Sequence, residues 1–265
     1  MHLSAIHLYP IKSGAALSLD NAEVEARGLA HDRRWMIVDP DGRFLTGREL
    51  PPLVRLQAVP TPDGLRLQAP GATPLTLPFP PASAPRRTVS IWDDTVDAID
   101  GGDDAAAWLS AWLGREVRLV HMDAAASRPV SLTHGQPGDE VSFADGYPLL
   151  VISQAALDGL NQRLTQPLPM LRFRPNLVVA GSAAHAEDAW RRVRIGALVF
   201  DAVKTCVRCV FTTVDPERGE IDRSGEPLRT LKTYRRSPRG ITFGMNLIAR
   251  GSGTLRVGDA VDVLA

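Results

Sequence analysis

The chain lacks several features that would assign it to a common class of protein. It has only two cysteines in 265 residues, Cys206 and Cys209, so no disulfide framework can form and the composition suits a reducing compartment. No apolar run reaches the roughly 18–20 residues that a membrane-spanning helix needs. The first residues, MHLSAIHLYPIKSG, do not have the basic and apolar regions of a signal peptide. We therefore expect a cytoplasmic protein that has no membrane partner.

An excess of positive charge is also missing. The 30 basic residues balance the 30 acidic ones, whereas proteins that bind nucleic acid without sequence preference are strongly basic. Three common motifs are absent as well: the phosphate-binding GxxxxGK[ST], the zinc-binding HExxH, and GxGxxG after a strand. The six histidines are scattered, and none has metal-ligand spacing to another histidine or to the cysteines. These absences argue against a nucleic-acid partner and against the nucleotide-binding and zinc-peptidase classes.

Glycine and proline, by contrast, are frequent, and they punctuate short apolar runs in a way that is typical of β-rich proteins. The chain holds 22 glycines and 21 prolines. SAIHLYPI reads as a strand, and Asp39–Gly42 reads as a turn between strands at 36–38 and 44–46. Strands resume in NLVVAG, VRIGALVFDAV and GTLRVGDAVDVLA. We therefore predict a mainly β fold.

Two helices interrupt this pattern. DDAAAWLSAWLG predicts a helix that an aspartate can cap and that Gly114 ends, with Trp108 and Trp112 packed on the core. SQAALDGLNQRL predicts a second helix, capped by Ser153 and carrying a stripe of leucines that ends at Leu164. The fold class is thus mainly β with a few helices (α+β). The change in character near residue 100 predicts two domains, residues 1–100 and residues 101–265.

The two cysteines form a CxxC pair whose spacing leaves several interpretations open. A zinc site needs a second pair of ligands, which the chain lacks. A dithiol redox site of the thioredoxin type precedes a helix, whereas β-branched residues follow here. Lys204 and Arg208 flank the pair and favour a thiolate, which is a soft metal ligand. From the spacing alone, a functional thiolate and an inert buried cysteine are about equally supported.

The sequence around the cysteines, CVRCVFTTVDPERGE, resembles the cysteine segment of MOSC-domain proteins, which are named for their relation to the C-terminal domain of molybdenum cofactor sulfurase. LYPIKS and GLAHDRRWMIVDPDGRFLTGRELPPL resemble the β-barrel domain that precedes MOSC in one branch, which contains the amidoxime-reducing proteins of mitochondria and bacteria. FRPNLVVAG, AEDAW and LKTYRR…FGMNLIARGSGTLRVGDAVDVL extend the resemblance over nearly the whole chain. It implies an N-terminal β-barrel-like domain packed on a β-barrel MOSC domain, with molybdopterin-bound molybdenum between them.

The resemblance also implies roles for single residues. Cys209 matches the catalytic cysteine that ligates molybdenum, and Cys206 matches a neighbour that is not a ligand. Cations and a hydroxyl from YPIKS, HDRRW and FRPN match contacts to the cofactor and its phosphate, and that anion favours charged N–H donors. The acidic residue of DGYP matches a contact to the pterin, whose N–H groups a carboxylate can accept. The cofactor-binding residues predicted in this way are Lys12, Ser13, Arg33, Asp145, Arg174 and Arg208.

At the level of function, the resemblance implies a molybdenum-dependent oxidoreductase that reduces N-hydroxylated substrates such as amidoximes, hydroxylamines and N-hydroxylated bases. No ferredoxin domain follows the MOSC strands and no membrane anchor precedes them, so we expect a separate electron donor of the flavin reductase, ferredoxin or cytochrome type. The family is also associated with pyridoxal phosphate binding. An alternative is a non-catalytic carrier of the molybdenum cofactor, or a sulfur or cofactor transfer protein. A third is a thiol–disulfide protein that uses both cysteines.

Two departures from the family pattern leave the substrate preference open. Gly14 and Ala15 follow the Lys-Ser pair, where relatives often have a cysteine or another residue. Asn246 stands in FGMN, where the amidoxime-reducing proteins carry an aromatic residue near the cofactor.

Overall fold

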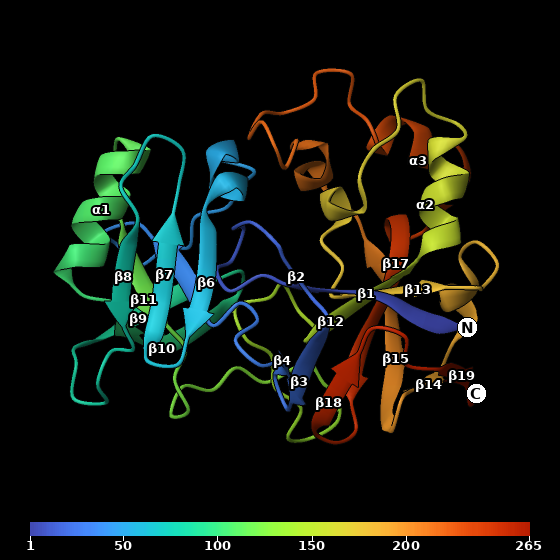
Figure 1. Cartoon of the computed structure of the whole chain (residues 1–265), viewed down its shortest axis with the longest axis horizontal. Helices are drawn as coiled ribbons and strands as arrows, with labels where there is room; N and C mark the ends of the chain where they lie inside the picture. The colour runs from blue at the N-terminus through green and yellow to red at the C-terminus, as the bar shows by residue number, and fades with distance from the viewer.

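A computed structural model of the chain describes all 265 residues and has two lobes side by side (Figure 1). We call the elements between residues 35 and 121 the N-terminal lobe. The C-terminal lobe comprises the large sheet and its helices, drawn in yellow to red, together with the strands that precede residue 35. Strands dominate both lobes, so the predicted mainly β class is confirmed.

The N-terminal lobe contains two small antiparallel sheets and one helix. One sheet has the order β5-β11-β10-β9, and the other has the order β6-β7-β8. In the β6-β7-β8 sheet, alternating leucines such as Leu65 and Leu67 point to one face, and they pack there with the helix of this lobe in one hydrophobic core. The elements are β5 (Trp35–Val38), β6 (Gln57–Thr61), β7 (Gly64–Gln68), β8 (Leu75–Pro78), β9 (Arg86–Ile91), β10 (Asp94–Asp100), α1 (Asp103–Leu113) and β11 (Arg118–His121).

The helix of this lobe confirms one sequence prediction and corrects another. Helix α1 covers the predicted residues and ends at Gly114, which adopts the left-handed conformation that glycine tolerates best. The predicted aspartate cap is wrong, because the cap position is Gly102 and no side chain bonds to the first turn. The Asp100 carboxylate instead accepts the Gly102 N–H at 2.8 Å.

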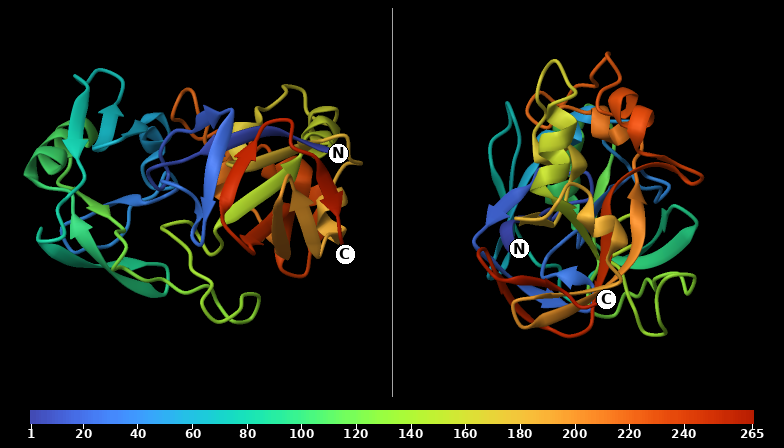
Figure 2. Two further views of the ribbon diagram at one scale, coloured as in Figure 1. Left: turned by 60° about the horizontal axis from the view of Figure 1, so that its bottom comes forward. Right: turned by 90° about the vertical axis from the view of Figure 1, so that its right-hand side faces the viewer.

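The C-terminal lobe is built on a nine-stranded sheet of order β19-β14-β15-β17-β12-β13-β1-β2, with β16 paired to β17. β1 pairs antiparallel with β13, and β3 pairs with β18, so strands from both ends of the chain close this lobe. Figure 2 places both termini at its outer end. The strands are β1 (His2–Leu8), β2 (Leu17–Leu19), β3 (Asn21–Glu25), β4 (Gly28–Leu29), β12 (Leu149–Ser153), β13 (Leu177–Ala180), β14 (Arg192–Ile195), β15 (Leu198–Val207), β16 (Arg236–Ser237), β17 (Gly240–Ala249), β18 (Gly253–Arg256) and β19 (Val261–Val263).

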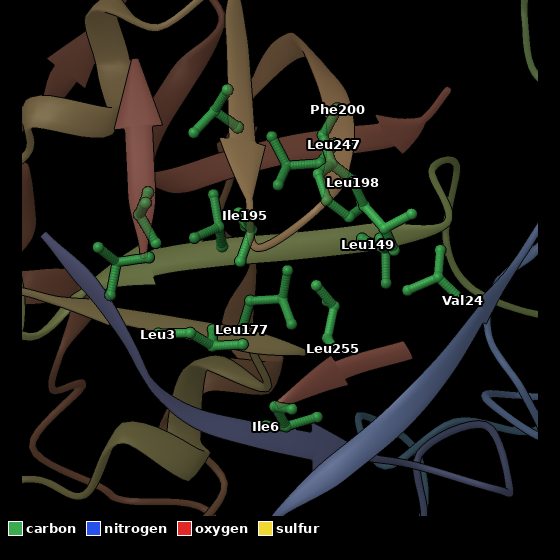
Figure 3. Packing of buried hydrophobic residues seen from close by; sticks show 14 of the residues in the cluster. Leu3, Ile6, Val24, Leu149, Leu177, Ile195, Leu198, Phe200, Leu247 and Leu255 are labelled. Carbon is green, nitrogen blue, oxygen red and sulfur yellow. The ribbon is translucent and has the colours of Figure 1, made fainter. Parts of the chain in front are cut away.

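The core of the C-terminal lobe is a cluster of 19 buried apolar residues. Figure 3 shows its side chains pointing toward one another from strands far apart in the sequence, among them Leu3 of β1, Leu177 of β13 and Leu255 of β18. Burial of this apolar surface supplies the main driving force for closing the sheet.

Two helices pack on the C-terminal lobe. Helix α2 (Gln154–Asn161) follows Ser153 as predicted, but the serine side chain does not bond to the first turn and the helix ends before Leu164. Helix α3 (Leu228–Tyr234) is not predicted, because its seven residues bury only Leu231 and carry no apolar stripe. None of the three α-helices combines the length and the apolar composition that crossing a membrane requires.

The two lobes are joined by the backbone of loops that lie between them. Lys12 N–H donates to the Trp35 carbonyl, Arg33 N–H donates to the Tyr9 carbonyl, and Phe143 N–H donates to the Arg33 carbonyl, at 2.8, 2.8 and 3.0 Å. These bonds fix the loops that carry the polar residues described below. The division of the chain at residue 100 stays a prediction, and elements on both sides of it, such as β5 and β11, pair directly.

His121, at the end of β11, predicts how stability depends on pH. Its ring packs 4.3 Å from the Trp35 ring and 5.5 Å from the Phe79 ring. Burial lowers its pKa to about 4, with the cations Arg34 and His31 adding to the effect and Asp123 opposing it. Between pH 6.5 and pH 4, His121 is therefore protonated in the unfolded chain but largely neutral in the folded chain. Its contribution to the free energy of unfolding is complete above pH 6.5 and falls by roughly 3 kcal/mol as the pH is lowered to 4.

Urea unfolding at pH 7 and pH 4 measures this loss. His121→Phe keeps the aromatic packing and should reduce the loss between the two pH values, whereas His2→Gln, at an exposed position, should not change it. An equal pH dependence in the wild type and His121→Phe would contradict the assignment.

Candidate functional site

All seven residues that the sequence predicts for the site line a single pocket, which has a volume of about 880 Å³ including its open mouth. Its lining is strongly cationic, and Asp145 is its one carboxylate. Segments of both lobes contribute, from residue 12 to residue 246. The cations of the lining are Lys12, Arg33, Arg48, Arg172, Arg174 and Arg208.

Unusual backbone conformations concentrate in this pocket. Six residues other than glycine have a positive φ, and four of them, Ser13, Arg33, Trp92 and Arg174, line the pocket with φ of 65°, 48°, 54° and 54°. This left-handed region costs a residue with a Cβ on the order of 1 kcal/mol, and such outliers gather where function requires them. The residues with unusual backbone conformations and the cationic side chains therefore gather at the same pocket.

Lys12 and Asp145 form an ion pair on one wall. The Lys12 ammonium donates to Asp145 Oδ1 at 2.6 Å and to the Phe143 carbonyl at 2.9 Å, and the Trp92 indole N–H donates to the same Asp145 oxygen at 3.3 Å. Enclosure by the pocket walls acts to raise the pKa of Asp145, but Lys12 and these hydrogen bonds hold that pKa well below its ordinary value. Burial lowers the pKa of Lys12 although Asp145 opposes it. The Asp145 side chain remains 73% exposed toward the pocket, which leaves Oδ2 available to accept hydrogen bonds.

Two arginines pack against the fully buried ring of Tyr9. The guanidinium carbons of Arg33 and Arg174 lie 4.3 and 4.2 Å from the ring centroid. Burial raises the pKa of Tyr9 to about 12 and lowers the pKa of Arg174 to about 10, so the phenol stays neutral and the guanidinium stays charged near neutral pH. Arg33 is neutralised by Asp32 and bonds to Asn176 Oδ1 at 2.9 Å, whereas Arg174 forms no ion pair.

Several N–H groups of the arginines in the pocket are buried without a partner. Arg174 Nη1 donates to the Gly14 carbonyl at 2.6 Å, but its Nη2 has no acceptor. Arg208 Nη2 donates to the Phe173 carbonyl at 2.6 Å, but its Nε has none. The Nε of Arg172 is also unpaired. An unsatisfied buried donor costs about 1–3 kcal/mol, and an acceptor on a bound ligand would relieve this cost.

The two cysteines lie in different environments. Cys209 is exposed, directly precedes the 3₁₀ helix η4 (Val210–Thr213), and its sulfur makes no hydrogen bond. Cys206 is half-buried on β15, and its sulfur accepts a bond from Arg208 Nη1 at 2.9 Å. Lys204 points to the Tyr147 ring, 5.9 Å away. The arginine that the sequence places beside the pair thus contacts Cys206, while the Cys209 thiol is free to bind a ligand.

Arg172 anchors the turn that carries Cys209. It lies in the 3₁₀ helix η2 (Met170–Phe173), donates to the Thr213 carbonyl at 2.9 Å, and pairs with Asp215 at 3.1 Å. Because Thr213 ends η4, these bonds hold the helix that begins just after Cys209. The Cys209 carbonyl also accepts bonds from Thr212 N–H and Oγ1 at 3.1 and 3.0 Å.

Sequence reasoning misses Asn176 and Trp92, which line the pocket, and Tyr9, which packs against two of its arginines. Tyr9 lies inside the motif LYPIKS and Asn176 inside FRPN. Their place in these motifs is the feature of the sequence that could have indicated a role near the site. Asn176 accepts bonds from Arg33 and from Leu150 N–H, and it donates to the His7 carbonyl at 3.2 Å. Trp92 lies in SIWDDT, a segment that gives no indication of a role in the pocket.

Comparison with known proteins places the whole chain among described families. Residues 1–116 match the MOSC N-terminal beta barrel domain, and residues 138–262 match the MOSC domain. The chain is 37% identical to mitochondrial amidoxime-reducing component 1 of Mus musculus, over 99% of this chain and 82% of the relative. It is 37% identical to mitochondrial amidoxime reducing component 2 of Bos taurus, over 98% and 82%. The identity to component 1 of Homo sapiens is 33%, over 99% and 82%.

Proposed function

Because this chain belongs to the family of MOSC-domain proteins with an N-terminal MOSC beta barrel that includes the mitochondrial amidoxime-reducing components, we propose that it is a molybdenum-cofactor-dependent reductase of N-hydroxylated compounds. The observation that carries the proposal is the pocket itself. It combines an exposed, unbonded thiol at Cys209 with cations brought together from three distant segments of the sequence.

The residues of the pocket fit a molybdenum–pterin cofactor. A terminal phosphate favours charge-assisted N–H donors, and the unpaired Nη2 of Arg174 and Nε of Arg208 are such donors. A thiolate is a strongly donating, polarisable metal ligand, and the exposed Cys209 thiol is free to supply one.

Each predicted residue then has a role that its chemistry supports. Cys209 would ligate the metal, and Asp145 Oδ2 would accept hydrogen bonds from the pterin ring. When bound, the cofactor supplies the two-electron chemistry that removes oxygen from an N–OH group, and the protein supplies position and electrostatics. Ser13 would donate a hydroxyl bond to the phosphate. The cations that would hold the phosphate and the pterin are Lys12, Arg33, Arg174 and Arg208.

Electrons would come from a separate donor protein of the flavin reductase, ferredoxin or cytochrome type. The substrate would reach the pocket beside Asn246, whose amide is fixed by a 2.9 Å bond to the Lys204 carbonyl. Cytoplasmic location and pyridoxal phosphate binding stay predictions.

The test is to purify the protein from a host that makes the molybdenum cofactor and to measure metal content by mass spectrometry. Turnover of benzamidoxime is then assayed with reduced methyl viologen as the electron donor. We expect close to one molybdenum per chain and molybdenum-dependent formation of benzamidine, and neither from a cofactor-deficient host. Absence of metal would overturn the proposal, whereas metal without turnover would favour a cofactor carrier.

A further inference from the structure

Trp92 stands at the tip of the hairpin that the N-terminal lobe extends toward the pocket. Strands β9 and β10 pair from Ile91 and Asp94, so Trp92 and Asp93 form a two-residue turn. The Trp92 side chain lines the pocket and is 43% exposed. The Trp92 side chain therefore presents an aromatic surface at the pocket, and packing in a hydrophobic core does not explain its presence there.

Two features of Trp92 are unfavourable for folding. Its φ of 54° lies in the left-handed region, where two-residue hairpin turns favour asparagine, aspartate or glycine. Its indole is also left partly in water, although burying a large aromatic side chain is strongly favourable. An outlier of this kind at a pocket points to a function of the side chain.

The indole is nevertheless held in a fixed orientation. The Arg48 guanidinium lies 4.4 Å from the ring, and the Phe44 ring lies 5.2 Å from it at 57°. The indole N–H donates to Asp145 at 3.3 Å. These three contacts orient the ring beside the ion pair of Lys12 and Asp145, and the side chain lines the pocket. A rigid aromatic surface of this kind binds flat ligands with little loss of conformational entropy.

We propose that Trp92 is a specificity-determining residue, whose exposed indole surface packs against the planar, conjugated part of the substrate. This inference rests on the proposed function. It predicts that aromatic amidoximes and N-hydroxylated heterocycles bind more tightly than aliphatic N-hydroxylated compounds of the same polar group. An aromatic pair contributes enough for a preference of roughly 3- to 10-fold beyond the effect of apolar area.

Two variants separate the aromatic surface from the hydrogen bond to Asp145. Trp92→Phe keeps an aromatic face but removes the indole N–H, and Trp92→Leu removes both. The probes are benzamidoxime and acetamidoxime, which share the N–OH group and differ in the planar ring. Binding of each to the oxidised holoenzyme is measured by calorimetry without a reductant, so no turnover occurs. Steady-state KM with reduced methyl viologen is measured separately.

We expect Trp92→Phe to keep the ratio of the two dissociation constants within about twofold, and Trp92→Leu to lower the preference for benzamidoxime by roughly 3- to 10-fold. An unchanged ratio in Trp92→Leu would overturn the inference. So would an equal loss in Trp92→Phe, which would assign the effect to the bond with Asp145, or a loss of molybdenum from Trp92→Leu, which would make Trp92 a cofactor contact. Wild-type protein that holds no molybdenum, or that reduces neither probe, would contradict the proposed function instead.

Discussion

Cys209→Ser is expected to remove molybdenum from the protein, whereas Cys206→Ser is expected to leave most of it bound. The Cys209 thiol is exposed in the pocket and makes no hydrogen bond, so it is free to act as a ligand. The Cys206 sulfur is half-buried and already accepts the bond from Arg208. A serine hydroxyl is a harder and less acidic group than a thiol, and it binds soft metal centres poorly.

The expected loss is large. Changes to groups that merely orient a metal ligand lower metal affinity or activity by about 10- to 100-fold, so loss of the ligand itself should lower both by roughly 100-fold or more. Metal content and benzamidoxime turnover of the two variants, made in the same cofactor-competent host, measure the effect. Thermal unfolding serves as the control for folding, because serine at the exposed position of Cys209 should change stability by less than about 0.5 kcal/mol.

The comparison of the two variants also discriminates between the hypotheses for the CxxC pair. A thiol–disulfide mechanism requires both sulfurs, so it predicts equal damage from Cys206→Ser and Cys209→Ser. A single metal ligand predicts damage from Cys209→Ser alone. Full molybdenum content in Cys209→Ser would show that Cys209 is not the metal ligand.

Local patterns in the sequence predict the elements of this fold better than their pairing. The apolar spacing and Gly114 predict α1, and turn residues predict strands such as β13 and β14. The pairing of β1 with β13 joins residues about 175 positions apart, and no local pattern encodes it. Helix α3 escapes prediction because tertiary contacts, chiefly through Leu231, hold a segment that has no amphipathic period.

The site divides in a similar way. Every predicted residue lines the pocket because motifs of the family carry their chemistry in the sequence itself. The orientation of Arg208 toward Cys206 could not be predicted, because adjacency in sequence does not reveal which sulfur a long side chain reaches. The packing of Arg33 and Arg174 against Tyr9 depends on contacts between segments that lie far apart in the sequence.

Arg174→Met is expected to weaken cofactor binding while leaving the cofactor-free protein no less stable. Arg174 forms no ion pair, its Nη2 is buried without an acceptor, and the like charge of Arg33 also packs on the Tyr9 ring. Burial and the charge of Arg33 both disfavour the guanidinium, which lowers its pKa to about 10. Methionine fills a similar volume and packs well against the rings of Tyr9 and Phe211, which the guanidinium now contacts.

The two effects of this substitution have different causes, so they can be measured separately. Without the cofactor, relief of an unpaired buried donor offsets the lost bond to the Gly14 carbonyl, and stability should be equal or up to about 1 kcal/mol higher. With the cofactor, loss of a charge-assisted contact should lower affinity by roughly 10- to 100-fold. Urea unfolding of protein from a cofactor-deficient host and the molybdenum content of protein from a competent host measure these quantities.

Arg66→Met is the matched control, because Arg66 lies exposed on β7 and does not line the pocket. It should change neither quantity. Arg174→Lys should fall between the wild type and Arg174→Met, because lysine keeps the charge but loses the forked pair of donors. If Arg174→Met binds molybdenum normally and unfolds more easily, then Arg174 stabilises the fold and does not bind the phosphate. If Arg174→Met instead binds molybdenum weakly and is equally or more stable, then Arg174 lowers the stability of the cofactor-free protein. Its unpaired N–H donor would then serve the bound ligand.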